Sequence, residues 1–142
     1  MKKLPIAMLL LAGIMCSASA QKLDALKVPA PVKETFAKKF PGVTPGWENE
    51  KGKYEAGFKN KGQSMSALFE ADGSLLETEV GMKPSGLPSS VTAYVKEHYK
   101  GATIKEAAKI TKADGTVNYE AEVNKMDVIF DAGGKFLKEE QD

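Results

Sequence analysis

Apolar residues recur at every fourth position in two separate stretches of the chain. The two sets are Val32, Phe36 and Phe40, and Val91, Val95 and Tyr99. Residues four apart lie on one face of an α-helix, so each stretch predicts a helix with one apolar side. A proline precedes each stretch and a glycine follows it, as is common at the two ends of helices: Pro29 and Gly42, then Pro88 and Gly101.

The pattern changes to a period of two after each predicted helix. Apolar and polar side chains largely alternate in residues 54–58 and 65–69, and again in residues 117–123 and 126–130. This alternation predicts antiparallel strands with one apolar face and one polar face. Pairs of turn-forming residues lie beside these runs: Lys51-Gly52, Lys61-Gly62, Asp72-Gly73, Asp114-Gly115 and Gly133-Gly134.

The same phrase occurs twice, as FEADGSLLETE from Phe69 and as FDAGGKFLKEE from Phe130. The predicted helix, the strand motif Tyr-Glu-Ala and this phrase follow in the same order in both halves. We therefore predict an α+β fold made of two tandem repeats, about 28–80 and about 87–138. Each repeat would have one helix followed by about four antiparallel strands, with both helices on one sheet face. Residues 82–86 are the expected connector, and whether the repeats share one sheet stays open.

Residues 1–20 have the features of a signal peptide. Two lysines precede an apolar stretch from Leu4 to Met15, which is too short to span a bilayer comfortably, and Ala18-Ser19-Ala20 is a cleavage motif. Cleavage after Ala20 would leave residues 21–142 as a single periplasmic or secreted domain without membrane insertion. A lipoprotein cut before Cys16 is the less favoured alternative, because Met15 is not a small residue.

The segments VPAPVKETFAKKFPG, WENEKGKYEAGF, LFEADGSLLETE and LPSSVTAYVKEHYKG resemble the PepSY-like family of small exported bacterial proteins. This family is also described as beta-lactamase-inhibitor-like. The resemblance covers nearly all of residues 21–142. It implies a tandem α+β repeat with antiparallel sheets and helices on one face. By analogy, it also implies binding or inhibition of another exported protein through the open sheet face, and it supplies no catalytic residues.

The chain offers little for catalysis or for metal binding. The single histidine, His98, has no cysteine or second histidine near it in the sequence, and no serine lies in a G-x-S-x-G motif. Asp72-Gly73 and Asp131 fit turn chemistry, and leucines occupy the positions where a calcium loop would need oxygen ligands. We therefore expect no catalytic residues, no cofactor and no metal site.

Charge argues against a nucleic-acid partner. Residues 21–142 carry 18 lysines (20 minus Lys2 and Lys3) against 19 acidic residues, and the chain has no arginine. Nucleic-acid-binding proteins usually show a basic excess and arginine forks.

Three residues are candidates for binding a partner. Alternation places Leu68 and Ile129 at equivalent positions on the otherwise polar sheet face, where they could form an apolar patch. Coverage by the neighbouring repeat or by residues 23–28 is the alternative. Trp47, the only tryptophan, is either an interface anchor or a core residue.

The leading hypothesis is a non-enzymatic binding module that engages another exported protein, with an unknown oligomeric state. A small-ligand-binding or envelope-stress protein is the main alternative, and a weak enzyme that uses His98 is the third.

Overall fold

The computed structural model describes residues 21–141, so the predicted signal peptide lies outside the described residues. Two helices and nine strands make up this part of the chain, together with two short 3-10 helices. In chain order, the elements are β1 (Gln21–Leu23), η1 (Ala25–Lys27), α1 (Ala30–Lys39), β2 (Gly46–Glu50), β3 (Lys53–Asn60), β4 (Gln63–Phe69), β5 (Leu75–Met82), η2 (Pro84–Gly86), α2 (Ser89–His98), β6 (Glu106–Lys112), β7 (Val117–Val123), β8 (Met126–Asp131) and β9 (Phe136–Gln141).

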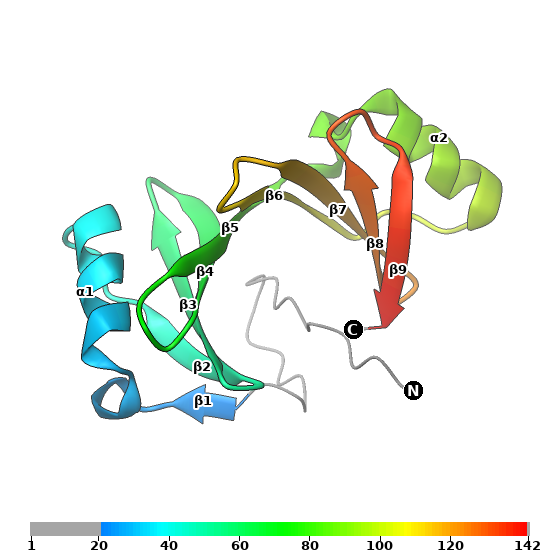
Figure 1. Ribbon diagram of the computed structural model, residues 1–142. Helices are drawn as coiled ribbons and strands as arrows, with labels where there is room; N and C mark the ends of the chain where they lie inside the picture. The colour runs from blue at the N-terminus through cyan, green and yellow to red at the C-terminus, as the bar shows by residue number, and fades with distance from the viewer. Residues whose placement is uncertain (1–20, 142) are drawn as a thin grey trace.

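The strands form one antiparallel sheet in chain order, from β1 to β9. β5 pairs with β6 over residues 77–82 and 107–112, so one continuous ladder joins the two halves of the chain. Figure 1 shows the sheet bent into an arch with α1 and α2 both on its outer side. The α+β class, the antiparallel strands and the two helices are confirmed, and the open question of one sheet or two is answered as one.

Each helix begins directly after its predicted proline, because Pro29 and Pro88 occupy the N-cap positions. Apolar residues spaced by four then face the sheet, and Val32 and Val91 are completely buried. Phe40 closes α1 by donating its backbone N–H to the carbonyl of Phe36. The period of four therefore determined which side of each helix packs.

The outer face of the sheet carries two separate hydrophobic cores. The first core, under α1, contains Val28, Val32, Phe36, Trp47, Ala56, Phe58, Ala67 and Phe69. The second core, under α2, contains Leu87, Val91, Val95, Ala107, Ala121, Val123, Val128 and Phe130. Between the cores, the same face of the β5–β6 pair presents Thr78 opposite Thr111, and Val80 opposite Lys109. This largely polar junction needs no helix to cover it, which fits the gap between α1 and α2 in Figure 1.

The repeated phrase forms the β4–β5 turn and the β8–β9 turn, and each turn packs against the start of a helix. Gly73 has φ of +91°, and a Cβ there would lie 2.6 Å from the carbonyl oxygen of Pro31 in α1. Gly134 has φ of +83° and approaches Ser90 in α2, whose hydroxyl donates to the carbonyl of Gly133. Glycine is thus required both for the left-handed backbone and for the close approach of turn and helix.

Among residues 21–141, no helix has the length and apolar character needed to cross a membrane.

Candidate functional site

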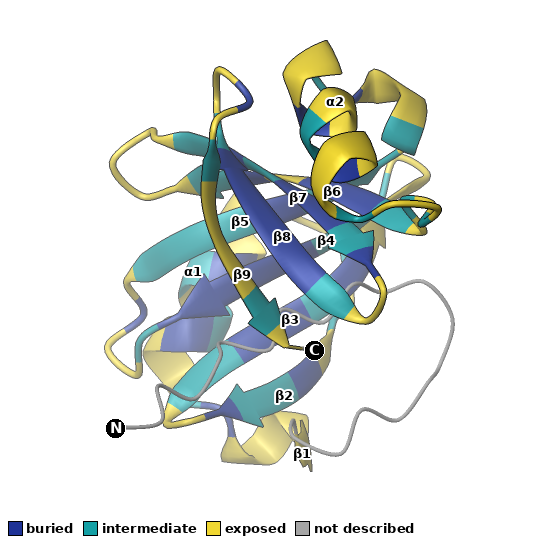
Figure 2. Ribbon diagram, turned by 90° about the vertical axis from the view of Figure 1, so that its right-hand side faces the viewer, coloured by how far each residue is buried: buried dark blue, intermediate teal, exposed yellow. Residues whose placement is uncertain are grey.

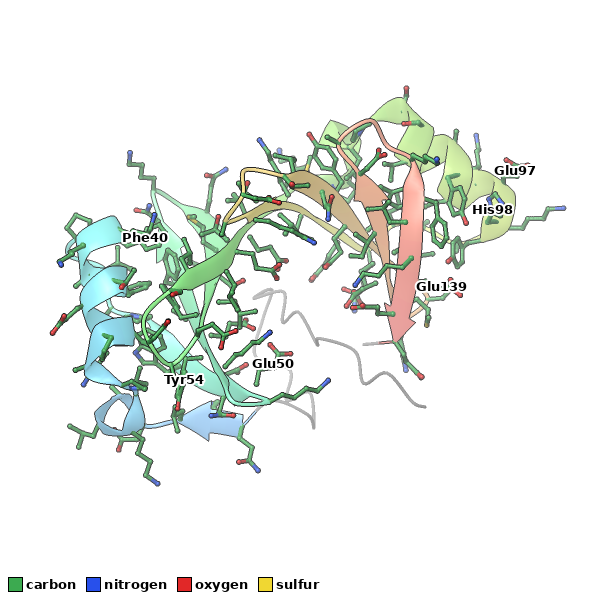
Figure 3. All side chains as sticks on the ribbon, in the orientation of Figure 1. Phe40, Glu50, Tyr54, Glu97, His98 and Glu139 are labelled. Atoms are coloured by element: carbon green, nitrogen blue, oxygen red, sulfur yellow. The ribbon has the colours of Figure 1, made fainter. Side chains whose placement is uncertain are left out.

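The helix-free face of the sheet is the inner side of the arch, and we call it the concave face. Strand register identifies its residues, because side chains directly opposite on neighbouring strands lie on the same face. Trp47, Ala56 and Ala67 are paired in register and belong to the first core, so the alternate residues face the other way. Figure 3 shows Glu50 directed into the arch and Tyr54 on the side of α1.

The concave face is rich in carboxyl groups. Its residues, strand by strand from β2 to β9, are Gly46, Glu48, Glu50, Lys53, Glu55, Gly57, Lys59, Ser64, Ser66, Leu68, Glu77, Glu79, Gly81, Glu106, Ala108, Ile110, Lys112, Asn118, Glu120, Glu122, Asp127, Ile129, Asp131, Lys138 and Glu140. The lysines lie along the margins of this set, and the interior of β5 and β7 carries glutamates without a lysine opposite them. Acidic residues therefore dominate the centre of the face.

Leu68 and Ile129 both lie on this face, as their alternation predicts. Leu68 is directly opposite Glu55, and Ile129 is directly opposite Glu120. Each also precedes a register shift, between β4 and β5 and between β8 and β9. Four strand spacings separate β4 from β8, about 19 Å along a flat sheet. The two residues thus lie in the two arms of the arch, each beside a buried glutamate.

The sequence allows Trp47 to be either an interface anchor or a core residue. In the structure it lies in the first core. Its ring packs against Phe36 and Phe69 with centroid distances of 5.6 and 6.3 Å. Only 6% of its surface is exposed. Residues 23–28 also lie away from the concave face, since Leu23 pairs with Trp47 and Val28 is part of the first core.

Glu50 and Glu55 form a pair of carboxyl groups in the first arm. Their side chains lie close enough for each carboxyl group to perturb the pKa of the other. Burial, with the neighbouring charge of Glu50 as the next cause, raises the pKa of Glu55 to about 10. Burial also raises the pKa of Glu50. The pair therefore holds a proton at neutral pH.

Glu79 and Glu120 are the two most enclosed carboxyl groups of the concave face, with 3% and 0% of their surface exposed. Within residues 21–141, no hydrogen-bond donor reaches either oxygen of these two side chains. Burial raises the pKa of both groups well above the usual value, and negative neighbours, Glu77 for Glu79 and Glu79 for Glu120, add to the effect. In Figure 2, buried residues lie along β8, whereas β5 is largely intermediate.

A second feature is a row of carboxyl groups that crosses four neighbouring strands. Glu106, Glu122, Asp127 and Glu140 are directly opposite one another in successive strand pairs. Like charges at directly opposite positions disfavour strand pairing, and the ion pair between Lys138 and Glu140 offsets part of this repulsion. In the described part of the chain, no three carboxyl, histidine or cysteine groups converge in a way that would hold a metal ion.

Sequence reasoning identified Leu68 and Ile129 and missed the carboxyl groups beside them. Glu55 and Glu120 occur in the repeated Tyr-Glu-Ala motif, where alternation alone assigns them to the polar face. A count of acidic residues at polar-face positions would have been the available signal. The convergence of Glu79 with Glu120 depends on the β5–β6 pairing, which no local pattern encodes.

His98 lies on the opposite side of the sheet, at the end of α2 (Figure 3). Its ring stacks on Tyr94 with a centroid distance of 3.9 Å, and its Nδ1 lies 3.0 Å from the carbonyl oxygen of Tyr94. The exposed histidine is thus engaged with its own helix and is remote from the concave face.

A family model described as "Putative beta-lactamase-inhibitor-like, PepSY-like" matches residues 52–138. The chain belongs to the PepSY-like family. The resemblance seen in the helix and strand segments is thereby confirmed. No curated protein matches the chain.

Several solved structures share this fold at low sequence identity. A "putative periplasmic" protein from Bacteroides eggerthii has a TM-score of 0.70 at 16% identity, covering 80% of this chain and 88% of that chain. A BLIP-like protein from Bacteroides fragilis has a TM-score of 0.64 at 22% identity, covering 79% and 85%. A DUF2874 family protein from Bacteroides uniformis has a TM-score of 0.69 at 16% identity, covering 79% and 88%. These similarities extend the fold to three Bacteroides proteins.

Proposed function

We propose that this PepSY-like protein is a non-enzymatic binding module that engages another exported protein through its concave face. Signal cleavage after Ala20 would deliver it to the periplasm or to the outside of the cell. The description of the family as beta-lactamase-inhibitor-like supports a protein partner, and the B. eggerthii neighbour, described as periplasmic, supports this location.

The observation that carries the proposal is the asymmetry of the sheet. Both helices and both hydrophobic cores lie on the outer face, and no helix or strand of residues 21–141 lies over the concave face (Figure 1). An open antiparallel sheet face is normally a solvated polar surface. Here it also carries the apolar side chains Leu68 and Ile129, which lie among the polar groups and are 6% and 5% exposed. Such a mixed surface is typical of faces that meet another protein.

We further infer that the face arose by tandem duplication. Glu55 lies beside Leu68 as Glu120 lies beside Ile129, and each pair adjoins a register shift. Duplication would double the width of a binding face without requiring a new hydrophobic core, because each half packs its own helix against its own strands.

Partner capture tests the proposed function. The wild-type protein and the Leu68→Asp and Ile129→Asp variants would be used to capture proteins from a periplasmic extract, and retained proteins would be identified by mass spectrometry. A specific partner should be lost from both variants, because a new charge at either position must be desolvated on binding. Affinity for the purified partner is then measured by calorimetry.

Leu26→Asp is the matched control, since Leu26 lies on η1 at the outer side and is 88% exposed. This variant should retain the partner. Leu68→Ala and Ile129→Ala remove the same side chains without adding a charge, and circular dichroism checks that they fold. They show whether loss of the partner reflects the surface or unfolding of the charged variants. If the partner binds all the folded concave-face variants as tightly as it binds the wild type, the proposed surface is wrong.

A further inference from the structure

The unpartnered carboxyl groups at the centre of the concave face indicate what kind of partner fits there. Burying a carboxylate without a hydrogen bond or an opposite charge is costly, and natural proteins usually pair such groups or keep them in water. Glu79 and Glu120 have neither kind of partner within residues 21–141, although both are almost fully enclosed. Their side chains therefore leave acceptor capacity that a positively charged donor can use.

Resting on the proposed function, we propose that the concave face receives a partner-protein segment bearing lysine or arginine, and that Glu79 and Glu120 accept its cationic side chains.

Strand register shows how these two carboxyl groups converge on one place. Glu79 is on β5 and Glu120 is on β7, so only β6 lies between them. Ile110 of β6 is directly opposite Glu79, and Ala108, two residues earlier on the same face, is directly opposite Glu120. Two strand spacings amount to about 10 Å along a flat sheet, and bending toward the concave side shortens the separation of the side-chain tips.

The side chains around the two carboxyl groups are mostly small or acidic. Ser66 of β4 is directly opposite Glu79, and Gly81 follows it on the same face of β5. Ser66, Gly81 and Ala108 thus place no bulky side chain beside the two carboxyl groups, and Ser66 and Ala108 are themselves enclosed. A lysine or arginine has a long apolar stem that can pack beside apolar side chains, and Ile110 and Ile129 lie next to the two carboxyl groups.

The charged groups facing this centre are predominantly negative. Glu77 neighbours Glu79 on β5, Glu122 neighbours Glu120 on β7, and Asp127 of β8 and Glu106 of β6 act on them electrostatically. On the positive side, Lys112 of β6 and Lys138 of β9 act on Glu77, whose position is nearer the margin. The centre therefore presents a negative potential when its carboxyl groups are ionised, and a cation entering it finds charge complementarity.

Binding of a cation at this centre must be coupled to proton release. Both carboxyl groups have a raised pKa in the free protein, chiefly because of burial. A neutral carboxylic acid that meets a lysine ammonium group loses its proton to the buffer and becomes a carboxylate paired with the ammonium. Affinity should consequently increase as the pH rises from about 5 to 8, since fewer protons then compete with the cation.

The test uses N-acetyl-tetralysine amide as the probe in isothermal titration calorimetry. The wild-type protein should bind it, and the apparent enthalpy should differ between phosphate and Tris buffers because protons are released. Glu79→Gln/Glu120→Gln keeps the shape and removes both carboxyl groups. It should weaken binding at least about tenfold and abolish the buffer dependence, because charge-assisted hydrogen bonds are lost.

Two further variants sharpen this test. Glu34→Gln/Glu97→Gln changes the net charge equally but lies on the exposed outer sides of α1 and α2, and it should bind within about twofold of the wild type. Ala108→Lys adds a cation opposite Glu120. It should weaken binding of the probe at least about tenfold, because the new ammonium group pairs with the carboxyl group in place of the probe.

Several results would overturn the proposal. One is a wild-type protein that does not bind the probe, and another is a double Glu79/Glu120 variant that binds it as tightly as the wild type. A calcium chloride titration with heat that depends on Glu79 and Glu120 would also overturn it, by assigning the site to a metal ion. The captured partner separates the two proposals. If Leu68→Asp loses this partner while Glu79→Gln/Glu120→Gln keeps it at full affinity, the proposed function stands and the cationic segment does not.

Discussion

The Glu50–Glu55 pair makes a quantitative prediction about how stability depends on pH. Glu55 has a pKa of about 10 in the folded protein, whereas the ordinary value is 4.5. Between about pH 5 and pH 8, Glu55 is therefore protonated in the folded state and ionised in the unfolded state. Because the folded state binds the additional proton, the free energy of unfolding must fall as the pH rises through this interval.

The magnitude follows from the linkage relation. For Glu55 alone, one proton released on unfolding lowers the free energy of unfolding by about 1.4 kcal/mol per pH unit, which gives at most about 4 kcal/mol between pH 5 and pH 8. That is a large fraction of the 5–15 kcal/mol typical of a domain. Glu79 and Glu120 also have a raised pKa and act in the same direction, so the difference between the wild type and Glu55→Gln isolates the contribution of Glu55. Asp72 and Asp114 have a lowered pKa, so their opposite contribution is confined to more acidic pH and leaves this interval unaffected.

Urea unfolding followed by the fluorescence of Trp47 measures this effect, because the buried ring becomes solvated on unfolding. The wild-type protein and Glu55→Gln are compared at about pH 5, 6.5 and 8. The free energy of unfolding of the wild type should fall steadily as the pH rises. In the variant it should fall less steeply, by about 1.4 kcal/mol per pH unit, because the Glu55 proton is absent, and the denaturant slope should be unchanged. Equal slopes against pH in the two proteins, or a wild-type stability that rises with pH, would refute the reasoning.

Two further predictions concern the fold. Gly73→Ala should destabilise the protein more than Gly115→Ala in thermal melts. Both positions have positive φ, which costs about 1–2 kcal/mol for alanine, but only the Gly73 Cβ would meet backbone, that of Pro31. Equal melting temperatures would show that the turn does not pack on α1. Phe36→Ala should lower the free energy of unfolding by about 3–5 kcal/mol, because removal of the buried ring leaves a cavity. Trp47 fluorescence and far-ultraviolet circular dichroism should still report one transition, because the β5–β6 ladder joins the halves. Two separate transitions would contradict this cooperativity.

The elements of the fold could be predicted because their signals are local. A period of four identified the buried sides of both helices, and a period of two identified strands β3, β4, β7 and β8. The glycine turns were equally clear. The turn at Asn124-Lys125 was not, since both residues adopt positive φ without any glycine to mark it. Residues such as asparagine tolerate this conformation, and the neighbouring strand pairing enforces it.

The candidate site could be predicted only in part, because its central features are non-local. Alternation placed Leu68 and Ile129 on the polar face, where the structure has them. Alternation does not reveal that Glu79 and Glu120 flank the same strand, since this depends on pairing between the two halves. Nor does it reveal that the sheet bends toward them. Burial of an acidic residue at a polar-face position is therefore a property of the assembled sheet.

The two faces of the sheet differ in how well their polar groups are paired. On the outer face, local propensity, apolar pattern and turn chemistry agree, and the cores under α1 and α2 are completed by their own helices. On the concave face these levels disagree, because the enclosed carboxyl groups of Glu79 and Glu120 have no hydrogen-bond donor in residues 21–141. Proteins tend to depart from internal consistency where they bind or react, and they offset the cost elsewhere. The two helix-covered cores supply that offset, and the positively charged partner proposed above would supply the donors that Glu79 and Glu120 lack.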